Sequence, residues 1–212
     1  GGTAQTNYLK ELYELGGTET KFAFDVFDTH LYCKYGDKHV PGLPAAAPEQ
    51  IFIYINDFRD IMRQYGDENK PIISTEVGYS TMDTLGYQTI CTYEKQRDYI
   101  VRTYLNAIAA DVKEVWLYNY HDDYLSATEG LEAEWGLINY FAVPKDSYYG
   151  YYNMYQQLKN TDYLGNVNGV RHPYYGNEFF DETKNKHISV VWAANDKDTM
   201  MQFQTLSGKD EK

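Results

Sequence analysis

The strongest constraint on the fold is a regular alternation of two hydrophobic patterns over the first 160 residues. In one pattern apolar residues recur at helical spacing, and in the other short runs are rich in branched and aromatic residues, as in strands. The helical segments are 3–15, 51–66, 93–110 and 146–158, and the strand-like segments are 21–33, 70–77 and 113–120. Helices and strands that alternate in this way are typical of βαβ units, so the sequence predicts an α/β fold with three adjacent parallel strands.

The pattern changes after residue 160, where short strand-like stretches follow one another without helices between them. They cover 175–180, 187–193 and 199–205. Strands in succession favour antiparallel pairing, and three strands alone do not complete a hydrophobic core. We therefore predict that residues 1–160 form the α/β part, and that residues 161–212 form the start of an incomplete, β-sandwich-like accessory domain packed against its helices.

Charge and hydropathy exclude several classes of partner. The formal net charge is −12, from 31 acidic and 19 basic residues. Such a surface repels phosphate backbones, so we expect no nucleic acid partner. No apolar run reaches the roughly 20 residues of a membrane span. The sequence opens on Gly1-Gly2 without a charged and then apolar leader, so we expect no signal peptide within this chain, although one can have been removed.

Tyrosine and cysteine contents leave alternatives open. The chain has 23 tyrosines, and a tyrosine ring suits stacking on a sugar as well as half-buried packing. Cys33 and Cys91 are too few for a disulfide framework, and whether they pair depends on the fold. No Cys/His spacing resembles a zinc site. We therefore expect neither a metal nor another cofactor.

Candidate functional residues lie where the predicted strands end, because functional groups of parallel α/β folds gather there. They are His30 and Tyr32 after the first strand, Glu76 after the second, and Trp116 and Tyr118 after the third. Alternate strand residues point to the same face, so Trp116 and Tyr118 share one. From that face either ring can stack on a sugar, or it can pack between the sheet and a helix.

Glu76 is the most informative of these residues. It closes an apolar strand, IISTE, and Gly78 follows where we expect a turn that glycine tolerates best. Glycoside hydrolysis requires one carboxylate at the anomeric carbon and a second to protonate the leaving oxygen, and a glutamate on a rigid strand end suits the first role. The structural alternative is an exposed glutamate, or one paired with a neighbouring arginine.

The segment 121–143 carries a group of carboxylates after the third strand. We predict a solvated acidic loop, with contacts to sugar hydroxyls or to calcium as the alternative. The group consists of Asp122, Asp123, Glu132 and Glu134.

Several segments resemble a known family in the same order along the chain. PIISTEVGYST resembles the seventh-strand nucleophile motif of clan A glycoside hydrolases, closest to the xylosidase-like and cellulase-like members. FDVFDTHLY resembles their sixth strand, and QRDYIVRTYLNAIAADVKEVWLYNYHDD resembles their seventh helix and eighth strand. EWGLINYFAVPKDSYYGYYNMYQQL resembles their eighth loop and helix, so the likeness covers about residues 5–160.

This resemblance implies the C-terminal part of a (β/α)₈ TIM barrel, since a whole barrel takes about 250 residues. It implies retaining hydrolysis of a polysaccharide or oligosaccharide, with Glu76 as nucleophile. His30 and Tyr32 are expected to line the pocket and orient Glu76, while Trp116 or Tyr118 is expected to lie beneath the sugar. The implied partners are a carbohydrate and the N-terminal remainder of the barrel, and the implied location is extracellular or the cell surface.

The resemblance also defines a gap. In that clan the acid/base glutamate follows an asparagine at the end of the fourth strand, whereas this chain corresponds to the fifth helix onward. The acid/base is therefore expected outside this chain or is lost. Two alternatives stay open: a non-catalytic, sugar-binding or structural protein with a glycosidase-like barrel, and an unrelated α/β protein in which the segments 21–33 and 113–120 do not flank Glu76.

Overall fold

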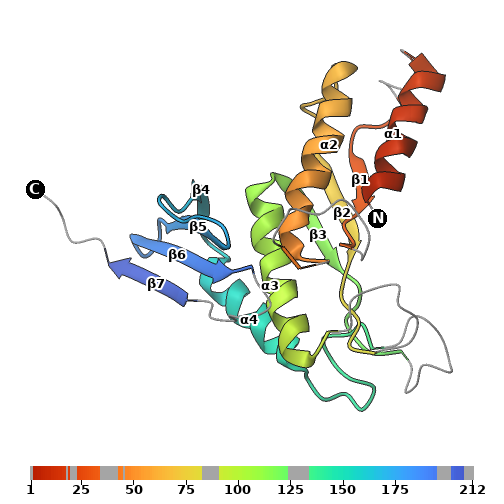
Figure 1. The fold of residues 1–212 in the computed structure, drawn as a ribbon. Helices are drawn as coiled ribbons and strands as arrows, with labels where there is room; N and C mark the ends of the chain where they lie inside the picture. The colour runs from red at the N-terminus through yellow and green to blue at the C-terminus, as the bar shows by residue number, and fades with distance from the viewer. Residues whose placement is uncertain are drawn as a thin grey trace, which may run out of the picture.

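The structure is a computed structural model, which combines an α/β part with an antiparallel sheet (Figure 1). It describes residues 2–17, 19, 23–33, 43–44, 46–82, 91–123, 134–194 and 202–207. The first elements are α1 (Gly2–Gly16), β1 (Phe27–His30), the 3₁₀ helix η2 (Pro48–Gln50), α2 (Ile51–Gln64), β2 (Ile72–Val77), α3 (Tyr93–Ala109), β3 (Val112–Leu117) and α4 (Asp146–Leu158). The sheet that follows consists of β4 (Asp162–Asn166), β5 (Tyr174–Asp181), β6 (Lys186–Ala193) and β7 (Gln202–Ser207).

Strands β1, β2 and β3 form a parallel sheet in that order, which confirms the predicted adjacency and direction. The described strands do not close into a barrel, so the sheet shows only part of the predicted architecture. Strand β1 is shorter than the predicted segment 21–33. Phe24, which lies before the strand, packs instead: its ring lies 6.1 Å from that of Tyr13 on α1, and Lys70 donates a hydrogen bond to the Phe24 carbonyl.

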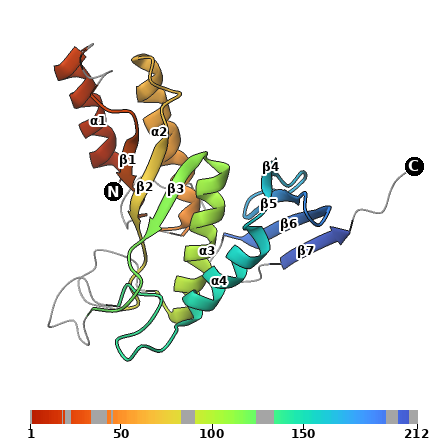
Figure 2. The same cartoon turned by 180° about the vertical axis from the view of Figure 1, so that it is seen from behind.

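One face of this sheet is buried against the helices. Figure 2 shows β2 and β3 in front of α2, with the other face of the sheet toward the viewer. The helix-covered core consists of Leu9 and Tyr13 on α1, Ile51, Tyr54, Ile55, Phe58 and Met62 on α2, Ile72 and Val77 on β2, Ala107 on α3, Val112 on β3, and Leu31, Cys33 and Ala46. Full burial of each large apolar side chain contributes about 1.5–3 kcal/mol. The opposite face carries exposed side chains such as Asp28 and Trp116.

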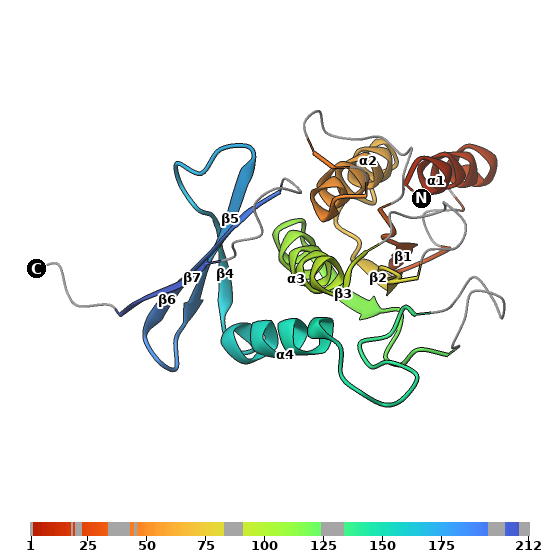
Figure 3. The same ribbon diagram turned by 60° about the horizontal axis from the view of Figure 1, so that its bottom comes forward.

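The second sheet is antiparallel in the order β4-β5-β6-β7 and packs on α3 and α4, as predicted for the tail. Figure 3 shows α3 between the two sheets. Strand β4 was not predicted, since it carries Gly165, where φ is 137° and the pairing with β5 shifts register. The buried contact joins Val101, Leu105 and Met154 to Phe179, Ile188, Val190 and Trp192. That this sheet begins a β-sandwich stays a prediction.

A buried polar network also joins the two parts. Arg102 on α3 forms an ion pair with Glu49 of η2, and both side chains are almost fully buried. The Trp192 indole N–H donates to Oε1 of Glu49 over 2.8 Å, and the Asn177 amide donates to the Leu105 carbonyl over 2.8 Å. A buried carboxylate is tolerated only when donors replace its water shell, so this network fixes the antiparallel sheet on α3.

No helix in the described part of the chain combines the length and apolar character needed to cross a membrane.

Candidate active site

A register shift turns Glu76 toward the open face of the sheet. From Asp28 to His30, two steps along β1 correspond to three steps along β2, from Ile73 to Glu76. One extra residue in a strand reverses the faces of the residues beyond it. Glu76 therefore pairs with His30 on the open face, whereas unbroken alternation from Ile72 would point it at the helices.

The carboxylate of Glu76 meets two side chains from the end of β1. The Tyr32 hydroxyl donates to Oε2 over 3.2 Å, and Nδ1 of His30 lies 3.2 Å from the same oxygen. No hydrogen bond from the described residues reaches Oε1, and the Glu76 side chain is 40% exposed. The expected contact of Glu76 with a Tyr or His of a neighbouring strand is thus present, and the pairing with an arginine is not seen among the described residues. The chemical roles of these residues stay predictions.

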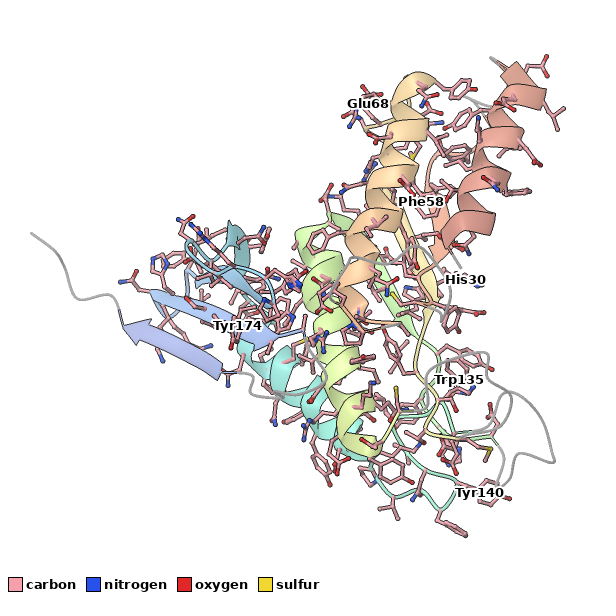
Figure 4. The ribbon with its side chains drawn as sticks, in the orientation of Figure 1. His30, Phe58, Glu68, Trp135, Tyr140 and Tyr174 are labelled. Atoms are coloured by element: carbon pink, nitrogen blue, oxygen red, sulfur yellow. The ribbon has the colours of Figure 1, made fainter. Side chains whose placement is uncertain are left out.

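Trp135 is a residue of this cluster that the sequence did not reveal. Its ring lies edge-on to Tyr32, with centroids 5.6 Å apart, and edge-on to Tyr118, with centroids 5.9 Å apart. The residue is only 8% exposed. Figure 4 shows Trp135 on the same side of the molecule as His30. The rings of Tyr32, Trp135 and Tyr118 therefore contact one another in sequence across the ends of β1 and β3. We call these three rings the aromatic row.

Gly78 makes room for this row, for a reason other than the predicted one. Its φ is not positive, so the turn itself does not require glycine. A Cβ at this position would lie 1.9 Å from the carbonyl oxygen of Tyr118 and 3.1 Å from Cε3 of Trp135. Glycine is therefore required by the close approach of the Tyr118 backbone, just beyond the end of β3, and of the Trp135 ring.

Trp116 shares the open face with Tyr118, because the alternating residues Val115 and Leu117 pack on the helix side. Its indole N–H donates to Glu114 over 3.2 Å, and 57% of Trp116 is exposed. No ring contact or hydrogen bond among the described residues links Trp116 to Glu76. The structure therefore brings together four of the five candidates, Glu76, His30, Tyr32 and, through Trp135, Tyr118, while Trp116 stands apart.

The prediction of a solvated acidic loop is wrong for Asp122. Its carboxylate is buried, forms an ion pair with Lys145 over 2.7 Å, and accepts the Gly136 backbone N–H over 2.7 Å. Burial raises the pKa of Asp122, although the Lys145 ammonium opposes that shift. Burial likewise lowers the pKa of Lys145, opposed by Asp122. The sequence could not separate this carboxylate from its neighbours, because its partner lies on the far side of the loop.

The other carboxylates of the loop differ from Asp122. Asp123 is exposed and accepts the Asn119 amide over 2.9 Å, and Glu134 accepts the Thr81 hydroxyl over 2.9 Å. Glu132 lies outside the described residues. No group of three or more His, Cys, Asp or Glu side chains within the described ranges could hold a metal ion.

Gln96 on α3 fixes the backbone around Trp135. Its side-chain amide is buried and donates to the carbonyl of Tyr79 over 2.7 Å and to those of Trp135 and Gly136 over 3.5 Å. The Ser147 hydroxyl donates to its Oε1 over 2.8 Å. Gln96 and the Asp122–Lys145 pair thus bind the backbone of residues 134–136, the segment that carries Trp135.

Cys33 and Cys91 are both buried, and no disulfide joins them. Both lie near Tyr79, whose pKa is raised mainly by burial.

Comparisons with known proteins show which solved structures have a similar fold. No protein-family model matches the sequence, and no curated protein matches it. Among solved structures, a family 39 glycoside hydrolase from the gut symbiont Bacteroides cellulosilyticus is similar, with a TM-score of 0.63 and 18% identity over 86% of this chain. A glucosidase from Croceicoccus marinus is similar with a TM-score of 0.57 and 9% identity over 84% of this chain.

Both solved proteins are much longer than the matched region. This chain spans 36% of the first and 35% of the second, about a third of each. Identities this low show the fold alone. The structure is thus similar, over part of their chains, to clan A glycoside hydrolases.

Proposed function

We propose that this chain is part of a retaining glycoside hydrolase that acts on a polysaccharide or oligosaccharide, with Glu76 as its nucleophile. The observation that carries the proposal is the position of Glu76, which the register shift aims at the open face beside His30 and Tyr32. The fold shared with part of a family 39 glycoside hydrolase supports it.

The geometry suits a double displacement. One carboxylate oxygen of Glu76 is held by Tyr32 and His30, and the other accepts no hydrogen bond from the described residues, on the face where a sugar would bind. Oε1 attacks the anomeric carbon as the glycosidic C–O bond breaks, and an acid/base carboxyl group protonates the leaving oxygen. Water then attacks the glycosyl–Glu76 ester and gives its proton back to that group. A retaining enzyme places the second carboxyl about 5–5.5 Å from the first, and we propose that it lies outside this chain.

The surroundings suit a sugar substrate. We propose that Tyr118 or Trp116, which share the open face of β3, lies beneath the sugar ring, because aromatic faces stack on the apolar faces of carbohydrates. The net charge of −12 is compatible with a neutral glycan. We also propose that the protein works at the cell surface or in the extracellular space.

The partner of the sheet is proposed to be the N-terminal remainder of a barrel. Within the described residues, β1 and β3 each pair with β2 on one side only, and the open face carries the exposed ring of Trp116. Strands with unpaired edges and an uncovered apolar side chain require another element to cover them.

The test compares Glu76→Gln with a matched control, Glu14→Gln on the exposed face of α1. Both keep shape and remove one charge. In the full-length protein we expect Glu76→Gln to lower kcat by at least about 10³-fold, because a nucleophile has been removed, while sugar binding persists and Glu14→Gln stays active. Release of reducing ends from a panel of glycans gives the rates. Undiminished hydrolysis by Glu76→Gln would exclude it as nucleophile, and a wild type that binds sugars but hydrolyses none would favour the non-catalytic alternative.

A further inference from the structure

Tyr32 contacts the candidate nucleophile from just beyond the end of β1, which ends at His30. The Tyr32 hydroxyl reaches Oε2 of Glu76 over 3.2 Å. A hydrogen bond at the far end of a phenol ring is sensitive to small rotations of that ring, so neighbouring side chains must set its plane.

We propose that Trp135 is a positioning residue that acts on Glu76 through Tyr32. The two rings meet edge to face, with centroids 5.6 Å apart and planes at 84°. That arrangement is favoured for aromatic pairs and restrains the Tyr32 ring from one side. His30 meets the same ring at 6.3 Å and 77°, which restrains it from another. The expected effect of Trp135 on catalysis rests on the proposed function, whereas its effect on the position of the Tyr32 ring does not.

Trp135 is suited to this role because it is itself held firmly. The residue is buried, and its carbonyl accepts hydrogen bonds from the Gln96 amide and from the Asn119 backbone N–H. The ion pair between Asp122 and Lys145 binds the adjoining backbone, where Lys145 donates to the Glu134 carbonyl over 3.2 Å and Asp122 accepts from Gly136. Buried polar groups with satisfied partners make the segment rigid, so the ring position is well defined.

The role is more specific than general packing. Among the described residues, the contacts of Tyr32 and His30 to the carboxylate are both made at Oε2, so Oε1 is the oxygen proposed to attack. Loss of the Tyr32 contact would let the carboxylate rotate and would weaken its orientation toward the anomeric carbon. Orientation affects the chemical step more than ground-state binding, so kcat should fall while KM changes little.

The test is a double-mutant cycle in the full-length protein, with Trp135→Leu, Tyr32→Phe and their combination. We expect Trp135→Leu to lower kcat about tenfold, with KM within about twofold. In the Tyr32→Phe background, Trp135→Leu should not lower kcat any further. Trp135→Phe keeps an aromatic edge and should recover most of the rate. Tyr149→Leu, at an exposed tyrosine of α4, is the matched control and should be silent.

A crystal structure of each variant separates this inference from the proposed function. In Trp135→Leu we expect the Tyr32 hydroxyl to move beyond about 3.5 Å from Oε2 of Glu76. A hydroxyl that stays in place, or a loss of rate that is fully additive with Tyr32→Phe, would overturn the inference. If Trp135→Leu does not fold, Trp135→His supplies the same two measurements, and Trp135→Phe remains the variant expected to keep most of the rate. If the wild type does not hydrolyse glycosides, the proposed function is wrong. The distance from the Tyr32 hydroxyl to Oε2 of Glu76 still tests whether Trp135 positions Tyr32.

Discussion

The carboxylates of Glu49 and Glu76 have opposite environments. Glu49 is almost fully buried and is bound by an arginine, an indole and the Asn106 amide. Glu76 is 40% exposed, and its contacts come from a tyrosine hydroxyl and a histidine. The carboxylate of Glu49 is closed off from solvent, whereas Oε1 of Glu76 accepts no hydrogen bond from the residues that the structure describes. A structural carboxylate and a candidate functional one are thus distinguished by their partners and exposure.

The largest expected effect comes from removing the partner of Glu49. Arg102→Met leaves a buried carboxylate without its counter-charge, so we expect the free energy of unfolding to fall by about 3–5 kcal/mol. Arg63→Met is the matched control, because Arg63 pairs with Asp60 at the surface, and it should cost at most about 1 kcal/mol. Chemical denaturation gives both values. A loss for Arg102→Met as small as that of the control would contradict the account of this interface.

A third carboxylate, Asp181 in the hairpin between β5 and β6, sharpens the comparison through pH. Hydrogen bonds from Lys184 and Thr183 lower its pKa from 3.8 to about 2. A folded-state pKa below the unfolded value stabilises the fold above the unfolded pKa, and this stabilisation is lost as the pH falls from 3.8 through about 2. Thermal melting between these pH values should therefore show a smaller pH dependence for Asp181→Asn than for wild type. Identical pH profiles would show that Asp181 does not contribute.

The smallest expected effect on stability belongs to Glu76. Its side chain is partly exposed and no cationic lysine or arginine among the described residues pairs with it, so Glu76→Gln should change the free energy of unfolding by no more than about 0.5 kcal/mol. The measurement is the same chemical denaturation used for Arg102→Met. A loss of several kcal/mol would mean that Glu76 is a structural residue like Glu49.

The sequence predicted elements better than it predicted contacts between them. Periodicity located the parallel strands and their helices, because burial of one face imposes that spacing on local sequence. It could not locate the extra residue in β2, because register depends on the neighbouring strand. The rule for strand ends selected Glu76, His30 and Tyr32 as candidates, and the resemblance to clan A glycoside hydrolases implied that His30 and Tyr32 orient Glu76. The position of Trp135 and the buried state of Asp122 depend instead on how a loop folds back.

The central claim is that Glu76 attacks the anomeric carbon, and covalent trapping tests it most directly. An activated 2-deoxy-2-fluoro glycoside slows hydrolysis of the glycosyl–enzyme ester, so the sugar remains attached to the nucleophile. The full-length protein should be inactivated with time, and mass spectrometry of its peptides should find the added sugar on Glu76, with no adduct in Glu76→Gln. A stable adduct on any other carboxylate would contradict the account, as would a protein that hydrolyses the parent glycoside yet forms its adduct equally well in Glu76→Gln.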